Sequence, residues 1–213
     1  MPVVRVGFRY SNRVELVSKL TIDLPEPSTD SSVSLEQAML QRRSVREYTN
    51  ATLDTTVLSQ LLWAAQGITD PSGKRTAPSA GALGPLEVYV VTADGMALYV
   101  PDGHRLEQKA KGDRRKALSS AAADQVKVAV APVVLVITGV MARTAWKYGG
   151  DRAWRYVNLE VGHAAQNVLL QASVMGLGAV PVGAFDDNGV MDVLGLPADH
   201  RPLYLIPVGR PAE

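Results

Sequence analysis

Apolar residues recur in steps of three and four between residues 154 and 175, and this is the strongest periodic signal in the chain. This spacing places them on one side of a helix with 3.6 residues per turn. The positions are Trp154, Val157, Val161, Ala165, Val168, Ala172 and Met175. The pattern predicts a long, deeply buried helix that ends at Gly176 and Gly178, because glycine commonly terminates helices.

Shorter helices are predicted where a capping residue precedes apolar residues at helical spacing. Ser34 and Gln37 form a capping-box pattern before a helix from Leu35 to about Gln41. Asp54 or Thr55 caps a second helix, which ends at Gly67. The apolar face of this second helix consists of Val57, Leu58, Leu61, Leu62 and Ala65. Further helices are predicted over residues 113–124 and 190–194.

Runs of alternating or β-branched residues predict strands. A hairpin is expected to turn at Pro101-Asp102-Gly103, between residues 96–100 and 105–107. The other predicted strands cover 86–92, 132–138, 179–185 and 202–208, with one or two more within 3–17. The run 132–138 is typical of a strand buried on both faces. Helices interleaved with strands and hairpins predict an α+β fold with helices packed on a sheet.

Two stretches poor in large apolar residues divide the chain. Pro25 to Ser34 is a connector that separates an N-terminal arm, residues 1–33, from a compact domain, residues 34–213. Thr69 to Pro85 is rich in Gly, Pro, Ser and Thr, so it is predicted to be a long loop within that domain. Long loops in compact domains are disproportionately functional.

Composition and charge exclude several classes of function. With 22 Lys+Arg against 21 Asp+Glu the net charge is +1, so no global field favours nucleic acid or an anionic membrane. The absence of Cys excludes disulfides, thiolate catalysis and Cys-based metal centres, and the three His do not stand at metal-ligand spacing. Charged residues interrupt residues 1–19, and no apolar run reaches membrane length. We therefore expect a soluble, cytoplasmic protein without a metal site.

The segment Arg42-Arg43-Ser44-Val45-Arg46 places a hydroxyl group between guanidinium groups that can approach one anion from neighbouring positions. The planar fork of Arg suits a phosphate, because it donates two parallel, charge-assisted hydrogen bonds. Taken alone, however, such a run is more often a solvated helix end, where it also complements the helix dipole.

Small residues dominate Pro78 to Pro85, so its backbone N–H groups can approach a flat ligand, although a plain surface loop has the same composition. A P-loop is excluded because Ile68 stands at its first Gly position, and a hydrolase elbow is excluded by Ala77. Gly176-Leu177-Gly178 is not a dinucleotide fingerprint, because Pro181 replaces its third glycine.

Two further features allow both a functional and a structural interpretation. The backbone amides of residues 180–185 are predicted to donate to a cofactor nitrogen, or to belong to an ordinary core strand. Lys147-Tyr148, before the long helix, is suited to proton transfer but is also typical of an amphipathic surface. Asn158 and His163 on that helix are interpreted as dimer-interface residues.

Together and in this order, these segments resemble the nitroreductase superfamily, and within it the SagB-type dehydrogenases. This branch includes the azoline oxidases of modified-peptide biosynthesis. The resemblance extends from about Leu35 to Pro211. Its specific segments are 42–46, 75–83, 155–156 with 162–167, 176–185 and 207–210.

The resemblance implies a central mixed β-sheet flanked by helices, and a homodimer that has the long helix at its interface and FMN between the subunits. The residues implied to hold the phosphate and ribityl end are Arg42, Arg43, Ser44, Arg46 and Arg210. Those implied to contact the isoalloxazine are Pro78, Ser79 and Gly81, with the partner subunit as their candidate source, and Val182, Gly183 and Ala184. Ala80, Gln166 and Pro181 are further implied cofactor-binding residues. Lys147 and Tyr148 match the proton-transfer pair of azoline oxidases.

The implied activity is hydride transfer at flavin N5, of the azoline-oxidation type, on a small-molecule or peptide substrate. The loop 78–85 lacks the Asn and Trp of the nitro-reducing branch, which favours the SagB-type branch, and Arg210 alone would close on the phosphate from the end of the chain. Two alternatives remain: an NAD(P)H-dependent reductase of nitro compounds or quinones, and a non-catalytic flavin-binding or scaffold subunit.

Overall fold

The computed structural model describes residues 20–212, so the strands expected within residues 3–17 lie outside the described part. Seven strands form one sheet. In the order in which they lie side by side, they are β1 (Thr21–Asp23), β4 (Arg105–Lys111), β3 (Gly95–Val100), β2 (Leu86–Val91), β5 (Val133–Val140), β7 (His200–Gly209) and β6 (Gly178–Ala179). The predicted hairpin at residues 101–103 is confirmed as the turn between β3 and β4.

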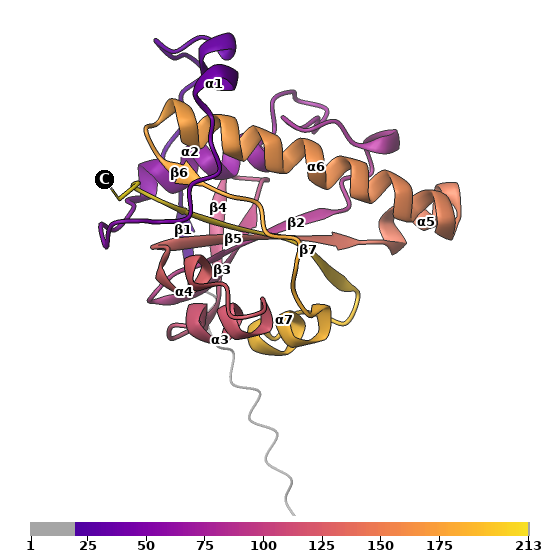
Figure 1. The fold of residues 1–213 in the computed structure, drawn as a ribbon. Helices are drawn as coiled ribbons and strands as arrows, with labels where there is room; N and C mark the ends of the chain where they lie inside the picture. Colours follow the sequence, from indigo (N-terminus) through magenta and orange to yellow (C-terminus); the bar gives the residue numbers. More distant parts are fainter. Residues whose placement is uncertain (1–19, 213) are drawn as a thin grey trace, which may run out of the picture.

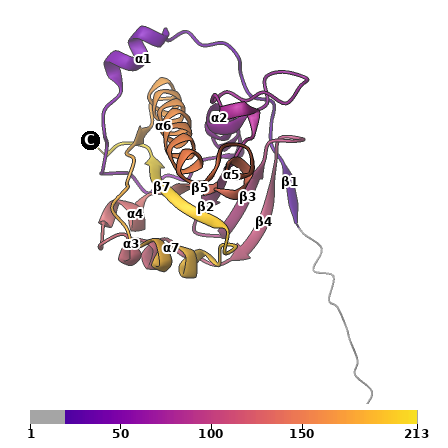
Figure 2. The same cartoon turned by 90° about the vertical axis from the view of Figure 1, so that its right-hand side faces the viewer.

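Helices cover both faces of the sheet (Figure 1). One face carries α2 (Thr55–Gln66) and α6 (Gly150–Val174), and the other carries α3 (Arg115–Ala121), α4 (Val126–Val130) and α7 (Asp187–Leu194). The view along α6 in Figure 2 shows this layering, with α2 and α6 above the sheet and α3, α4 and α7 below it. Two short helices, α1 (Leu35–Gln41) and α5 (Ala142–Tyr148), lie at opposite ends of α6 (Figure 1). The α+β fold is confirmed.

The sheet is antiparallel in every pairing of its seven strands, and this corrects the expected mixed sheet. The path of the chain gives the reason. After β5, helix α6 carries the chain to one end of the sheet and residues 178–185 carry it back along β7. Strand β7 therefore begins beside the end of β5, with His200 opposite Val140, and has to run antiparallel to it.

Strand β5 is buried along its whole length, as its β-branched run predicts. Val133, Leu135 and Ile137 belong to the core under α2 and α6. Val134 and Val136 belong to the core on the other face. Successive side chains point to opposite faces of a strand, so one apolar run contributes to both cores.

The predicted helix starts are confirmed. The Ser34 hydroxyl accepts from the Gln37 amide at 3.2 Å, and the Gln37 side chain accepts from the Ser34 amide at 3.1 Å. Asp54 caps α2 by accepting from the Val57 amide at 2.9 Å. Each bond satisfies a backbone donor that has no partner within the helix.

Two predicted elements differ in the structure. The strand expected over 179–185 is reduced to β6 and a separate bridge between Val182 and Leu205, because Pro181 has no amide to continue a ladder. The long helix is confirmed, but it is not buried all round. Trp154 is 54% exposed, which corrects its assignment to the buried face. Residues 142–148, for which no element was predicted, form α5.

Candidate functional site

The Arg segment, residues 42–46, lies beside β6, the short strand that follows α6. The Val45 amide donates to the Ala179 carbonyl at 3.1 Å, and Ser44 forms an isolated bridge with Ala179. A few residues later, the Thr49 amide donates to the carbonyl of Arg210 at 2.9 Å. Three segments that are far apart in the sequence therefore meet at one edge of the sheet, as the phosphate-binding hypothesis requires.

The guanidinium groups of this segment differ in their contacts. Arg43 donates to the carbonyls of Leu40 and Arg42, both at 2.8 Å, so it satisfies groups at the end of α1. Among the described residues, Arg46 makes a single hydrogen bond, to the Ser44 carbonyl at 3.2 Å. Within residues 20–212, Arg42, Arg46 and Arg210 have no carboxylate within ion-pair distance. This edge therefore carries positive charge that the described residues do not neutralise.

Lys127 adds a further cation, which the sequence did not indicate. Burial and the nearby charge of Arg46 lower the pKa of Lys127. Its ammonium group donates to Gln125 Oε1 at 2.5 Å, and Gln125 Nε2 donates to the carbonyl of Ala184 at 2.9 Å. Because both residues come from α4 and its N-cap, and no helix was predicted there, no signal in the sequence connected them with residue 184.

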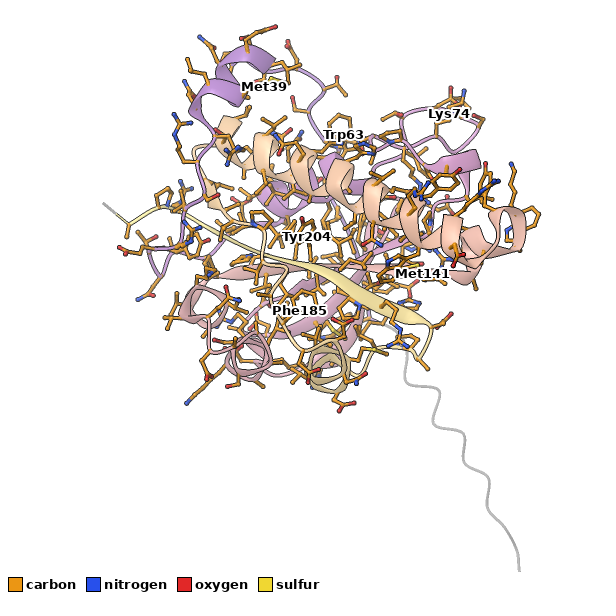
Figure 3. The ribbon with its side chains drawn as sticks, turned by 45° about the vertical axis from the view of Figure 1, so that its right-hand side comes forward. Met39, Trp63, Lys74, Met141, Phe185 and Tyr204 are labelled. Atoms are coloured by element: carbon orange, nitrogen blue, oxygen red, sulfur yellow. The ribbon has the colours of Figure 1, made fainter. Side chains whose placement is uncertain are left out.

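The segment 182–184, which follows β6, presents free backbone donors. Val182 exchanges two hydrogen bonds with Leu205, at 2.8 and 3.0 Å, which fixes the segment against β7. The next two residues, Gly183 and Ala184, are exposed, and their amides donate no hydrogen bond to any group among the described residues. In Figure 3, Tyr204 and Phe185 lie on opposite sides of β7, and they pack against different cores. The chain therefore crosses the edge of the sheet here with its amides uncovered.

The second predicted group of residues meets around Gly81. This residue has a φ of +64°, which glycine adopts without strain. A Cβ atom added at Gly81 would lie 2.8 Å from the Tyr148 hydroxyl oxygen and 2.9 Å from Lys147 Nζ. The loop 78–81 and the predicted proton-transfer pair on α5 are thus in direct contact. The ring of Tyr148 also packs edge-on against Tyr156 of α6, with 5.0 Å between centroids.

Glu160 lies beneath this loop on the buried face of α6, and sequence reasoning missed it. Its side chain is 3% exposed, and burial raises its pKa to about 7. The Ser79 hydroxyl, the Arg75 charge and the Ala80 backbone favour its ionised form without offsetting burial. A signal was present, because Glu160 stands three residues after Val157 and directly before Val161, on the apolar stripe of the helix.

The Arg segment and the residues that meet around Gly81 lie at opposite ends of α6. Lys147 and Tyr148 precede its first residue, whereas Ala179, which pairs with the Arg segment, follows its last turn. A helix of 25 residues is about 37 Å long, at roughly 1.5 Å per residue. One chain therefore does not bring the loop 78–81 to the Arg segment. Gln166 is exposed on α6 between them.

No helix within the described residues has the length and apolar character needed to cross a bilayer. In the same part of the chain, no three His, Asp or Glu side chains gather in a way that could hold a metal ion. A cavity of about 580 Å³ between the start of α2, the β2–β3 turn and α4 contains none of the predicted site residues.

A family model, related sequences and solved structures all assign the chain to the same protein family. Residues 39–210 match the Nitroreductase family. A protein of Methanocaldococcus jannaschii named as a nitroreductase is 43% identical over 199 residues, covering 91% of this chain and 98% of that protein. An NADH dehydrogenase of Thermus thermophilus is 29% identical, covering 83% of this chain and 86% of that protein. The crystal structure of a nitroreductase from Ralstonia eutropha superposes with a TM-score of 0.84 at 32% identity, covering 91% of this chain and 90% of that one.

Proposed function

Because this chain belongs to the nitroreductase family of flavin-dependent oxidoreductases, we propose that it is an FMN-dependent oxidoreductase that works as a homodimer. The observation that carries the proposal is the edge formed by the Arg segment, residues 182–184 and Arg210. It offers, side by side, uncovered backbone amides and cations that have no acidic partner among residues 20–212.

The cations at this edge fit the phosphate of FMN. A phosphate monoester carries close to two negative charges, and several converging donors are needed to replace its water. Arg42, Ser44 and Arg46 would hold it from one side and Arg210 from the other. Lys127, close to Arg46, would add to the positive potential. Arg43 donates instead to carbonyls at the end of α1, so we assign it a smaller contribution to phosphate binding.

The uncovered amides fit the ring system. An N–H from Gly183 or Ala184 would donate to a ring nitrogen, with Pro181 and Val182 against the ring and Gln125 fixing the carbonyl of Ala184. When bound, FMN would supply the redox chemistry by exchanging a hydride with the substrate at N5. The protein would contribute orientation and electrostatic stabilisation.

A second subunit would complete the site. The loop 78–81 lies near the start of α6, whereas the Arg segment of the same chain lies near its C-terminal end. We therefore expect Pro78, Ser79, Ala80 and Gly81 of one chain to meet the Arg segment of the other. Large apolar side chains are exposed on the helices that would form such an interface, and burying them would favour association. They are Leu35, Met39 and Leu40 on α1, and Trp154 and Leu159 on α6. Gln166, exposed on the same helix, would contact the cofactor there.

Lys147 and Tyr148 would transfer the proton that accompanies hydride transfer. Their polar atoms converge on Gly81, and Lys147 Nζ lies 5.4 Å from the centre of the Tyr148 ring. This arrangement supports a SagB-type oxidation of azoline-like rings in a small molecule or peptide. The name of the Thermus thermophilus relative favours a second candidate, an NAD(P)H-dependent reductase.

Titration of FMN into the purified protein tests the cofactor, and failure to bind would exclude both enzymatic functions. Anaerobic NAD(P)H separates the candidates, because bleaching of the flavin absorbance identifies the reductase. Bound flavin that no donor or acceptor turns over would indicate a scaffold subunit.

The role of Lys147 is tested by Lys147→Ala, which we expect to lower turnover by about 100-fold, the usual size of a general acid–base contribution. Lys74→Ala is the control, because Lys74 lies in the same loop region, is exposed and pairs with Asp70. Equal turnover of the two variants would exclude the proposed role.

A further inference from the structure

Glu160 is a buried acid that the proposed chemistry does not use. Its side chain is 3% exposed, and within residues 20–212 its Oε1 atom has no hydrogen-bond partner. A buried carboxylate oxygen without a donor is energetically costly, whereas a neutral carboxyl group is much less so. Burial therefore favours the protonated form of Glu160, and it outweighs the donors from Ser79 and Ala80, which favour the ionised form.

The groups around Glu160 come from three elements. The Ser79 hydroxyl and the Ala80 backbone face it from the loop, and the Arg75 charge acts on it from the start of that loop. Arg75 itself donates to the carbonyl of Gln66 at 3.3 Å, so it is engaged elsewhere. One turn earlier on α6, Tyr156 packs against Tyr148.

The loop is thus enclosed between two sets of polar groups. Glu160 lies against residues 79–80, and Lys147 and Tyr148 converge on the next residue, Gly81. Any movement of residues 79–80 away from α6 would move Gly81 away from Lys147 and Tyr148. The position of the Glu160 carboxyl group is therefore coupled to the geometry of the proton-transfer pair.

We propose that Glu160 is a positioning residue, which as a neutral acid holds residues 79–81 against α6 and releases them when it loses its proton. The placement of the loop against Lys147 and Tyr148 then depends on pH near neutrality. The consequence for catalysis rests on the proposed function, but the movement of the loop does not.

The direction of the pH dependence follows from linkage. With the loop closed, burial holds the pKa of Glu160 at about 7, whereas a hydrated carboxyl group has its ordinary value of 4.5. Proton binding therefore favours the closed loop, and the loop opens progressively as the pH rises. Between pH 6 and 8.5 these two values give a change of about tenfold in the opening equilibrium.

Amide hydrogen exchange of the full-length protein, with and without FMN, measures this equilibrium. The probe is the amide of Ala80, whose hydrogen bond to the Glu160 carboxyl group is lost when residues 79–81 leave α6. After correction for the intrinsic exchange rate, its protection should fall by about tenfold from pH 6 to 8.5. Glu160→Gln should abolish this fall.

Two variants sharpen the test. Ser79→Ala should move the fall in protection to higher pH, because the Ser79 hydroxyl favours the ionised acid. Asp192→Asn, which removes an exposed carboxylate on α7 on the other face of the sheet, should keep the fall seen in the unmodified protein. The infrared C=O band of a protonated carboxyl group should also titrate near pH 7 in the unmodified protein, so the test survives if Glu160→Gln does not fold.

Protection that does not change with pH in the unmodified protein, or the same fall in Glu160→Gln, would overturn the proposal. A protein that fails to bind FMN would contradict the proposed function, and the exchange data without FMN would still decide the role of Glu160.

Discussion

Arg43 and Arg46 stand three residues apart in one segment, yet their guanidinium groups do different things. Arg43 folds back onto the carbonyls of Leu40 and Arg42 and so completes the end of α1. Arg46 extends from the edge of the sheet with one weak bond to the Ser44 carbonyl. The two residues therefore form a matched pair for testing the phosphate site.

We expect Arg46→Ala to weaken FMN binding by about 10- to 100-fold, the range that a charge-assisted hydrogen bond of roughly 1.5–3 kcal/mol provides. The unfolding free energy of the FMN-free protein should change little, because Arg46 is exposed. Fluorescence titration of FMN and urea unfolding measure the two quantities. Arg43→Ala should weaken binding much less, and equal losses in both variants would contradict a specific role for Arg46.

Gly81 allows a second comparison, because it joins the loop to Lys147 and Tyr148. Gly81→Ala introduces a methyl group 2.8 Å from the Tyr148 hydroxyl oxygen and 2.9 Å from Lys147 Nζ, so both side chains have to move. Turnover should fall at least tenfold. Gly73→Ala is the control, since Gly73 also has a positive φ, +84°, but has nothing within 4 Å of the added atom.

Each of these two substitutions should cost about 1–2 kcal/mol of unfolding free energy through the left-handed backbone conformation. Thermal unfolding and steady-state kinetics separate the two effects. A fall in turnover of the same size in Gly73→Ala would show that backbone strain alone explains the loss.

At the scale of elements, the turn between β3 and β4 is fixed to α2 by a partly buried chain of hydrogen bonds. His104 in the turn contacts the Tyr99 hydroxyl through Nδ1 at 2.8 Å and Ser59 Oγ of α2 through Nε2 at 2.6 Å. Ser59 in turn donates to the carbonyl of Pro25 at 2.5 Å. A single imidazole thus connects the hairpin, a helix and the segment that follows β1.

This connection should weaken in acid. Burial lowers the pKa of His104, so below its ordinary value of about 6.5 the unfolded chain binds a proton that the folded protein excludes. The contribution of His104 to stability is complete above pH 6.5 and is lost as the pH falls below that value. Urea unfolding at pH 7.5 and 5.5 measures the loss.

Comparison with variants isolates the contribution of His104, since Glu160 and His200 also titrate. His104→Gln should be less stable at pH 7.5 by about 1–3 kcal/mol, the cost of unsatisfied buried groups, but should lose less stability on acidification. Asp192→Asn, at an exposed position on α7, should retain the full loss. An unchanged pH dependence in His104→Gln would exclude His104 as its source.

At the scale of the molecule, the proposed site depends on two chains. Leu159 is 57% exposed on α6, and a dimer formed through this helix would cover it. Leu159→Arg should give a monomer in sedimentation analysis, and FMN affinity should fall by at least tenfold although no residue of the Arg segment has changed. Leu20→Arg is the control, because Leu20 is 55% exposed but directly precedes β1, at the edge of the sheet opposite the Arg segment. A monomeric variant with undiminished FMN affinity would show that one chain forms the whole site.

The sequence by itself determined the features that depend on neighbouring residues. The starts of α1 and α2 follow from Ser34 and Asp54, because a cap bonds only to amides two or three positions away. The period of α6 and the continuous apolar run of β5 follow from the faces that these elements bury. The order of the Arg segment, the small-residue loop and the strand end was sufficient to indicate the family.

Only the tertiary structure decided which residues meet. The sequence did not place Gln125 against Ala184 or Glu160 beneath Ser79, because those contacts join elements whose packing depends on the whole chain. Local reasoning also treated Arg43 and Arg46 alike, and it expected a mixed sheet where the return path after α6 imposes an antiparallel one. Secondary structure is encoded in local spacing and capping, whereas the environment of a charge, and hence its chemistry, is set by groups brought together on folding.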